Sequence, residues 1–316
     1  MFHVLQVSTG YSDGTLEAAA ITAAGGTHAL VASQNAADIA AAGQDANGLL
    51  VTLTRVPAEL IEAMPKLEVI VRAGIGVDNI DLVAAKQRGV RVYNLPHYCQ
   101  DEVADHTVAM LMCLERKLYQ QVQDIKRGEW NPARKYKPIG GMQGACVGFL
   151  GCGGIARRVA ERLRPFGIRA VGYDPYLPAQ VAAQAGITLM DRDDVIRQAD
   201  FLSLHMPLTA ETERMMNEET FAKMKEGTYL INSARAGLID HDALYAAVKS
   251  GRLGGAALDV VDNDIEGAKR FADLQNVLIT PHTAYYSAQA DVKIRSQAGD
   301  LFAAVIRGES PDSRIV

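Results

Sequence analysis

The sequence predicts an α/β fold built from two doubly wound parallel sheets. Short apolar runs rich in β-branched residues alternate with helical stretches along the chain, which indicates parallel sheets covered on both faces. A length of 316 residues suits two domains. The helical stretches 101–127 and 287–307 are longer than the rest and flank six predicted strands. We therefore expect them to cross between a discontinuous domain, 1–100 with 287–316, and a second domain, 101–286.

The first domain is expected to start directly with a strand. Pro57 can open a helix over 57–63, because proline's missing N–H costs nothing at the first helical position. Asp81 can cap a helix over 81–88, which Gly89 would end. The predicted strands of this domain are 2–8, 27–32, 48–53, 67–71 and 90–93.

The second domain shows the same alternation of strands and helices. We expect one unbroken helix over 101–127 that ends at Gly128. Ser287 is expected to cap the C-terminal helix, which would return the chain to the first domain. Further helices are predicted over 217–226 and 240–250, capped by Asn217 and Asp240. The predicted strands are 145–150, 168–173, 200–204, 228–232, 255–260 and 276–280.

Composition and charge exclude several classes of protein. A net charge of -5 lacks the basic field that general nucleic-acid binding needs. No apolar run approaches the ~18 residues that span a bilayer, and the first eight residues lack the basic segment of a signal peptide. The four cysteines form no C-x-x-C pair, which favours reduced thiols in a cytoplasmic protein. No spacing of histidine and cysteine fits a zinc pattern, so we expect no metal.

A glycine pattern after the predicted strand 145–150 indicates a dinucleotide-binding, Rossmann-type domain. The residues 151–156 read G-x-G-x-x-A between a strand and a helix. Gly151 permits the tight turn, and Gly153 lets the backbone approach a pyrophosphate because no Cβ is present. The N–H groups of Gly153, Gly154 and Ile155 would then point at the phosphates from a helix N-terminus.

Asp174, at the end of the next strand, decides between a ligand site and a simple tight turn. It lies 23 residues after Gly151, where a carboxylate can accept hydrogen bonds from the ribose hydroxyls of the adenosine. It would also repel a 2′-phosphate, and residues 175–178 contain no arginine or lysine. We therefore predict NAD rather than NADP as the cofactor.

Three predicted strand ends collect polar residues that packing does not require. They are the segments 232–237, 259–264 and 280–286. In a parallel sheet, ligands bind beyond the carboxyl ends of the strands. We therefore expect these segments to converge near the nicotinamide.

With these motifs in place, the sequence resembles the D-isomer-specific 2-hydroxyacid dehydrogenases, which include phosphoglycerate dehydrogenases and C-terminal-binding proteins. The resemblance runs from about Val69 to the end, and the tail 281–287 is similar to the C-terminal-binding-protein version. It implies two Rossmann- or flavodoxin-like domains with the active site in the cleft between them. The motifs that carry it are 72–81, 101–107, Pro207-Leu208-Thr209 with Thr212, 232–240 and 281–287.

The resemblance implies roles for individual residues. Arg235 would bind the substrate carboxylate with its guanidinium fork, and His282 would be the acid/base that exchanges a proton with the substrate oxygen. The family's acidic partner of this histidine is a Glu, but position 264 here is Asp. Asp264 is our candidate, and Asp262 and Glu266 remain alternatives because the Asp264 side chain is one methylene shorter.

Other implied roles concern cofactor and substrate binding. Asp259 would hold the nicotinamide carboxamide. The residues implied near the cofactor also include Thr107, Pro207, Thr212 and Ala234, and those implied near the substrate are Arg72, Ala73, Gly74, Ile75, Tyr98 and Tyr285.

The family's activity would make this chain an NAD-dependent enzyme that interconverts a 2-keto acid and a D-2-hydroxy acid. The alternatives are an NADH-sensing co-regulator like the C-terminal-binding proteins, or specifically a phosphoglycerate dehydrogenase or hydroxypyruvate reductase. The resemblance also implies a homodimer formed through the long helix near 101–127.

Overall fold

A computed structural model describes residues 1–7, 13–262 and 264–316 as two units, each built around one parallel sheet. The first unit is Met1–Cys99 with Ser287–Val316, and the second is Gln100–Tyr286. The paired strands of both sheets run parallel. The predicted α/β class with two parallel sheets is therefore confirmed.

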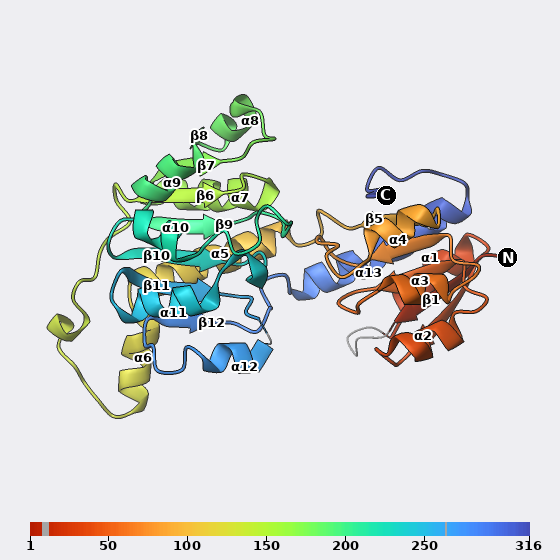
Figure 1. Cartoon of the computed structure of the whole chain (residues 1–316), viewed down its shortest axis with the longest axis horizontal. Coiled ribbons are helices and arrows are strands. Elements are labelled where there is room, and N and C mark those ends of the chain that lie inside the picture. The colour runs from red at the N-terminus through yellow and green to blue at the C-terminus, as the bar shows by residue number, and fades with distance from the viewer. Residues whose placement is uncertain (8–12, 263) are drawn as a thin grey trace. The chain divides into compact units, whose positions relative to one another are not determined.

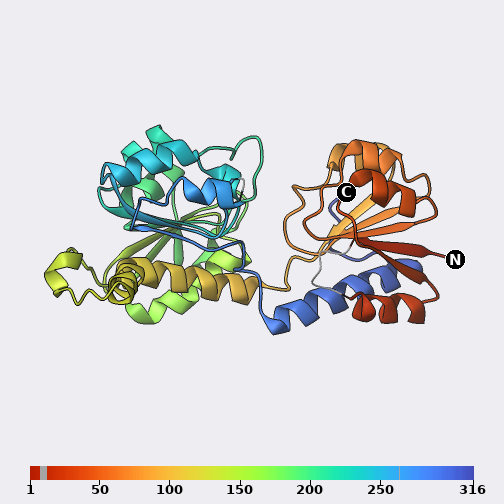
Figure 2. The same ribbon diagram turned by 90° about the horizontal axis from the view of Figure 1, so that it is seen from below.

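The first unit carries a five-stranded sheet in the order β2-β1-β3-β4-β5. One face is covered by α1 and α13, and the other by α2, α3 and α4 (Figure 2). Its elements are β1 (His3–Val7), α1 (Thr15–Ala23), β2 (Thr27–Val31), α2 (Ala36–Ala42), β3 (Gly48–Val51), α3 (Ala58–Glu62), β4 (Val69–Arg72), α4 (Leu82–Gln87), β5 (Arg91–Asn94) and α13 (Ala288–Ile306). Ser8, which ends the first predicted strand, lies outside the described residues.

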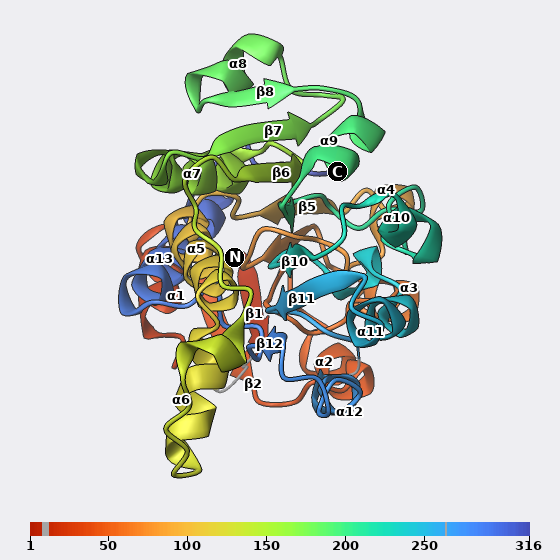
Figure 3. The ribbon, with the colours of Figure 1, turned by 90° about the vertical axis from the view of Figure 1, so that its left-hand side faces the viewer.

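The second unit carries a seven-stranded sheet in the order β12-β11-β10-β9-β6-β7-β8 (Figures 1 and 3). Its first elements are α5 (Gln100–Glu115), α6 (Leu118–Lys126), the short 3-10 helix η1 (Ala133–Tyr136), β6 (Cys146–Leu150), α7 (Gly154–Leu163), η2 (Arg164–Phe166), β7 (Arg169–Tyr173), α8 (Ala179–Gln184), β8 (Ile187–Leu189) and α9 (Arg192–Gln198). The rest are β9 (Phe201–Leu204), α10 (Glu218–Lys223), β10 (Thr228–Asn232), η3 (Ala236–Leu238), α11 (His241–Lys249), β11 (Leu253–Leu258), α12 (Asp264–Lys269) and β12 (Val277–Ile279).

Two apolar cores cover the faces of this second sheet. Side chains of α5, α7 and α8 pack on one face, and side chains of α9, α10 and α11 pack on the other. Strand residues such as Phe149 and Leu204 are completely buried. Every parallel strand therefore delivers its carboxyl end to the same edge of the sheet, between the two helical layers.

The predicted helix caps are present. Asp81 accepts a hydrogen bond from the N–H of Ala84 at 2.9 Å, and Ser287 accepts one from Ala290 at 2.9 Å. The side chains of Asn217 and Asp240 cap α10 and α11 in the same way. The helix expected at Pro57 begins one residue later, at Ala58.

One strand was not predicted, and one predicted helix was wrong. The three-residue strand β8, at one edge of the second sheet, was not predicted. The single helix over 101–127 is broken at Lys117, which has a left-handed φ of 49°. The buried face of α5 packs beneath the sheet, whereas α6 leaves the sheet and exposes Leu118, Val122 and Ile125.

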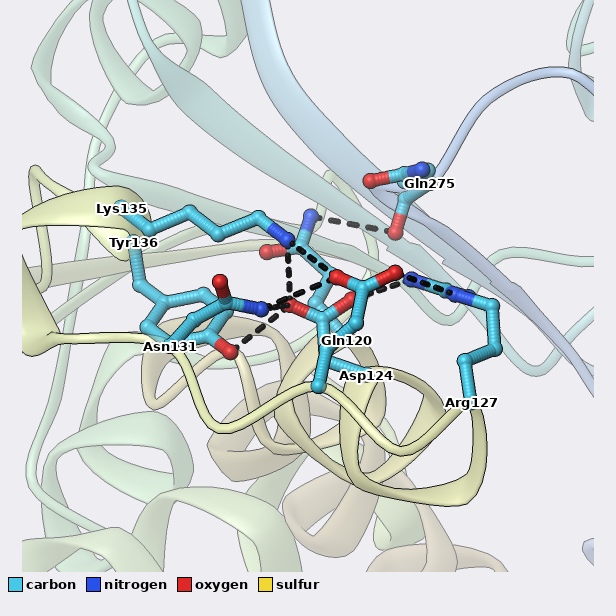
Figure 4. A network of polar contacts seen from close by, with 8 residues as sticks. Gln120, Asp124, Arg127, Asn131, Lys135, Tyr136 and Gln275 are labelled. Atoms are coloured by element: carbon cyan, nitrogen blue, oxygen red, sulfur yellow. Dashed lines mark hydrogen bonds and ion pairs between the residues drawn. The ribbon is translucent and has the colours of Figure 1, made fainter.

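The segment 118–136 forms an arm that is held by one buried carboxylate (Figure 4). Asp124 accepts hydrogen bonds from Asn131 Nδ2 at 3.0 Å, Lys135 Nζ at 2.8 Å and the Tyr136 hydroxyl at 2.7 Å, and Arg127 also contacts it. The hydrogen bonds from Lys135 and Tyr136 hold the pKa of Asp124 below its ordinary value. The arm therefore has a defined conformation although most of it lies off the sheet.

Within the described ranges, none of the helices combines the length and apolar character that a membrane crossing requires. All four cysteines are present as free thiols.

Candidate functional site

The glycine turn after β6 leaves open space at the position predicted to meet a pyrophosphate. Gly151 has φ 85°, and a Cβ there would lie 2.8 Å from the carbonyl group of His205, so packing alone demands glycine. A Cβ at Gly153 would meet no protein atom within 4 Å. Packing does not explain Gly153, and the space beside it can admit a ligand, as the dinucleotide pattern predicts.

Asp174 lies beside this turn, at the end of β7. Its Oδ2 accepts a hydrogen bond from the N–H of Cys152 at 2.9 Å, and its Oδ1 accepts from the N–H groups of Tyr176 and Leu177 at 3.0 and 3.1 Å. These bonds fix the carboxylate against the glycine turn. A carboxylate accepts about four hydrogen bonds, so Asp174 retains capacity for a ribose hydroxyl.

The loop after β9 borders the glycine turn from the other side. The Thr212 hydroxyl donates to the carbonyl of Pro207 at 2.7 Å and accepts from the N–H of Thr209 at 2.8 Å, which closes the loop on itself. His205 N–H donates to Leu150 O at 2.8 Å. The predicted cofactor residues Pro207 and Thr212 therefore lie in a loop that starts next to Gly151.

Sequence reasoning did not select His205 in this loop. Its Nε2 lies 2.9 Å from Ser203 Oγ, and its ring packs against Phe149. Burial lowers the pKa of the His205 imidazole to about 4, so the ring is neutral near pH 7. The available signal was a histidine directly after a buried strand, next in the sheet to the glycine-turn strand.

The segment after β10 is fixed by side chains around Arg235. Asn232 Nδ2 donates to Arg235 O at 2.8 Å, and Asn232 Oδ1 accepts from the N–H of Ala234 at 3.0 Å. The Thr107 hydroxyl, from α5, lies 2.8 Å from Ser233 Oγ. The predicted residues Thr107, Ala234 and Arg235 are thus brought together at one strand end.

Asp259, at the end of β11, holds the segment that carries His282. Its carboxylate accepts from the Thr280 hydroxyl at 2.6 Å and from the N–H groups of Thr283 and Ala284 at 2.9 and 3.0 Å. Its carbonyl accepts from His282 N–H at 2.8 Å. Asp259 is only 1% exposed, so it anchors the loop from inside the fold.

His282 has an unusual backbone conformation for a histidine. Its φ is 52°, in the left-handed region that favours glycine. Its ring meets the Tyr285 ring edge-on at a centroid distance of 5.8 Å. The strained conformation depends on the surrounding hydrogen bonds, and this is typical of residues at functional sites.

The three candidate acids near His282 differ in their partners. Asp262 Oδ2 lies 3.0 Å from His241 Nδ1, and Glu266 forms an ion pair with Lys269 at 2.6 Å. Asp264 is exposed at the start of α12 with φ 49°. Among the residues that the structure describes, no hydrogen bond or ion pair joins its carboxylate to another side chain.

The remaining predicted substrate residues, apart from Tyr285, lie in the first unit. Arg72 ends β4, and its guanidinium lies so close to Gly74 that a Cβ there would overlap it. Asn94 Nδ2 donates to Ile75 O at 2.6 Å, which fixes the turn 73–75, and Tyr98 is buried. No cluster of three or more potential metal ligands occurs in the described part of the chain.

The family profile described as "D-isomer specific 2-hydroxyacid dehydrogenase, NAD binding domain" matches residues 108–284, more than half of the chain. A D-3-phosphoglycerate dehydrogenase of Rattus norvegicus is 38% identical over 268 residues, which cover 84% of this chain and 50% of that protein. One of Methanocaldococcus jannaschii is also 38% identical over 268 residues, with coverages of 84% and 51%. The chain thus spans about half the length of these curated relatives.

Solved structures show the same fold over the full chain. A D-lactate dehydrogenase of Aquifex aeolicus, complexed with NAD and lactic acid, has a TM-score of 0.89 at 28% identity and covers 97% of this chain and 96% of its own. An acyclic imino acid reductase in complex with NADPH and D-Arg also has a TM-score of 0.89, at 25% identity and full coverage of both chains.

Proposed function

Because the chain belongs to the family of D-isomer specific 2-hydroxyacid dehydrogenases, we propose that it is an NAD-dependent oxidoreductase that interconverts a 2-keto acid and a D-2-hydroxy acid. One observation carries the proposal. Arg235, Asp259 and His282 follow the adjacent strands β10, β11 and β12, so a guanidinium, a carboxylate and an imidazole share one end of one sheet.

The cofactor would bind in the unit that we propose as the NAD-binding domain, 101–286. Gly151, Gly153, Gly154 and Ile155 would receive the pyrophosphate at the N-terminus of α7, where the absence of a side chain at Gly153 leaves room. Asp174 would accept from the ribose and disfavour a 2′-phosphate. The fixed strand-end loops around Pro207, Thr212 and Ala234, and the contact of Thr107 with Ser233, support the assignment of these four residues to cofactor binding.

Bound NAD supplies the hydride acceptor, and NADH the donor, while the protein handles charge and protons. Arg235 would bind the substrate carboxylate and polarise the carbonyl. His282 would give a proton to the carbonyl oxygen in reduction and take it from the hydroxyl in oxidation. Asp259 has three of about four acceptor positions filled, which leaves one for the nicotinamide carboxamide.

The acid that pairs with His282 is proposed to be Asp264. Its carboxylate is exposed, whereas His241 and Lys269 already pair with the two alternatives, Asp262 and Glu266. Single substitutions Asp264→Asn, Asp262→Asn and Glu266→Gln test this choice. We expect the first to lower kcat the most; a larger loss in either of the others moves the role to that residue.

The substrate-binding domain is proposed to be 1–100 with 287–316. Arg72, Ala73, Gly74, Ile75 and Tyr98 would bind the substrate together with Tyr285. The chemistry of Arg72 favours a substrate with a distal anionic or hydroxyl group. The relatives named D-3-phosphoglycerate dehydrogenase support a substrate of this class.

A panel assay tests the proposed activity. Purified protein with NADH is mixed separately with glyoxylate, hydroxypyruvate, pyruvate, 2-oxoglutarate and 3-phosphohydroxypyruvate, and the absorbance of NADH is followed. We expect at least one 2-keto acid to be reduced. Normal NADH binding without turnover of any of them would instead favour an NADH-sensing binding module, which the tail 281–287 resembles.

We also propose that the protein is a homodimer formed through the arm. Leu118, Val122 and Ile125 are exposed apolar residues on α6, and Trp130, the only tryptophan, is 91% exposed. An apolar face of this kind on a separate element is typical of a protein interface. The four free thiols support a cytoplasmic location, which cell fractionation would check.

The assembly is tested by sedimentation and by Trp130 fluorescence across a dilution series. A dimer should lose mass on dilution as the emission shifts to longer wavelength. Val122→Glu should give a monomer, while the matched control Val83→Glu, at an exposed valine of α4, should not. A monomeric wild type, or equal effects of the two variants, would contradict this assembly.

A further inference from the structure

A histidine outside the proposed catalytic set lies against the Asp259 anchor. His106 projects from α5, and its Nε2 is 3.0 Å from the Thr280 hydroxyl and 3.6 Å from Asp259 Oδ1. The Thr280 hydroxyl is 2.6 Å from the same carboxylate oxygen. Three side chains from α5, β11 and the end of β12 therefore form a connected chain.

Counting protons fixes the direction of these hydrogen bonds. The Thr280 hydroxyl has one proton, and a carboxylate only accepts, so that proton goes to Asp259. The sulfur of Met110, 3.9 Å from the hydroxyl, is a much weaker acceptor. His106 must then donate from Nε2 to Thr280, which assigns its Nε2–H form.

The same carboxylate holds the backbone around His282. Thr283 and Ala284 donate their N–H groups to its two oxygens, and the N–H of His282 donates to the Asp259 carbonyl. The left-handed φ of His282 costs free energy that these bonds must offset. Any group that orients the Asp259 carboxylate therefore also orients this segment.

We propose that His106 is a positioning residue: by donating through Thr280 to Asp259, it holds the 280–284 segment that presents His282. This inference deepens the proposed function and rests on it for its catalytic consequence, but the relay is a property of the fold itself. His106 would touch neither substrate nor cofactor in this role. Its Nε2–H donor, rather than a positive charge on the ring, would hold the segment.

Substitutions by side chains of similar shape separate hydrogen-bond donation by His106 from its charge. Gln can place a donor near the position of Nε2 without an ionisable ring, whereas Leu removes the donor. Thr280→Val removes the hydroxyl at nearly constant shape. The control His3→Leu breaks a histidine–threonine hydrogen bond with Thr27 in the first unit.

Amide hydrogen exchange of the full chain tests the relay without requiring activity. We expect His106→Leu and Thr280→Val each to speed exchange of the amides of residues 282–284 roughly threefold to tenfold, as the loss of one hydrogen bond implies. Because both changes break the same chain of hydrogen bonds, the double variant should speed exchange by less than the product of the two single factors. His106→Gln and His3→Leu should match the wild type in this segment.

Unchanged exchange in Thr280→Val, or exchange in His106→Gln as fast as in His106→Leu, would overturn the proposal. If His106→Leu does not fold, His106→Phe, which also lacks a donor, takes its place in this comparison. In the assay, kcat should fall by a similar factor in His106→Leu with KM for NADH unchanged, and His106→Gln should restore it. If the wild type reduces no 2-keto acid, the proposed function fails, but the exchange result still decides the relay.

Discussion

Asp259 and Asp124 are both almost completely buried carboxylates, and each holds an irregular segment by several hydrogen bonds. Their donors differ. Asp124 is paired with the cations of Arg127 and Lys135 in addition to the neutral donors Asn131 and Tyr136. Asp259 has no lysine or arginine partner that the structure describes, and it accepts from a hydroxyl and two backbone N–H groups, with the His106 imidazole near it. Compensation of charge suits a purely structural anchor, because it reduces the cost of burying the carboxylate.

The difference indicates that a buried carboxylate serves two purposes in this protein, one at the proposed active site and one in the arm. At the end of the sheet, fixed cations would compete with Arg235 and His282 for an anionic substrate, and neutral donors avoid that competition. The arm carries none of the proposed catalytic residues, so charged donors can hold its loop against α6 without affecting substrate binding. Variants in the two places should therefore affect different properties.

The largest contrast is expected from His282→Ala. If Asp259 presents a catalytic imidazole, this change should lower kcat by roughly 10²- to 10⁴-fold while NADH affinity, measured by fluorescence titration, stays unchanged. The matched variant in the Asp124 cluster is Tyr136→Phe, which should leave kcat unaltered. Loss of NADH affinity in His282→Ala would mean that the residue binds cofactor instead.

The glycine turn extends the contrast to binding. Gly153→Ala should fold normally, because no protein atom lies near the added Cβ, yet weaken NADH binding by roughly tenfold, or ~1.4 kcal/mol. Gly141→Ala, at another glycine with open space around it, is the control for a methyl group alone. Equal NADH affinity in Gly153→Ala and wild type would show that the pyrophosphate does not approach there.

The arm should respond to acid through Asp124. Its folded pKa lies below the ordinary value of 3.8, so its stabilising contribution is complete only well above that value and is lost as pH falls through the folded pKa. We expect the fluorescence anisotropy of Trp130 to drop in that range. Asp124→Asn should abolish this transition, and an identical acid transition in the variant would assign it to another group.

The smallest effect is expected at Cys152 within the glycine turn. Burial raises the pKa of its thiol to about 12, so little reactive thiolate forms at pH 8. Mass spectrometry after iodoacetamide treatment should find Cys113, which is partly exposed, labelled before Cys152. Early labelling of Cys152 would show that the turn opens in solution.

The features predicted correctly from the sequence depend on neighbouring residues. Caps such as Asp81 and Ser287 bond to amides within three positions, and strand–helix alternation decides the fold class. The break at Lys117 was not predictable, because lysine carries no signal for a left-handed conformation and the helical pattern continues beyond it.

Prediction of the site divides in the same way. The glycine turn and Asp174 follow from local spacing, and the roles of Arg235 and His282 remain predictions that come from resemblance. The relay from His106 to Asp259 was not predicted, because it joins positions far apart in the chain, and nothing in the residues around 106 indicates a partner near 280.

The discontinuity of the first unit sets an order of events on the ribosome. Phe302 of α13 is completely buried and packs where a Cβ at Gly48 would lie, beneath β3. The five strands of that unit are synthesised first but must wait for α13 to emerge before one face of their sheet can be covered. Residues 100–286 form one uninterrupted stretch, so the second unit can fold earlier. The first unit, whose strands are synthesised first, would complete its folding last.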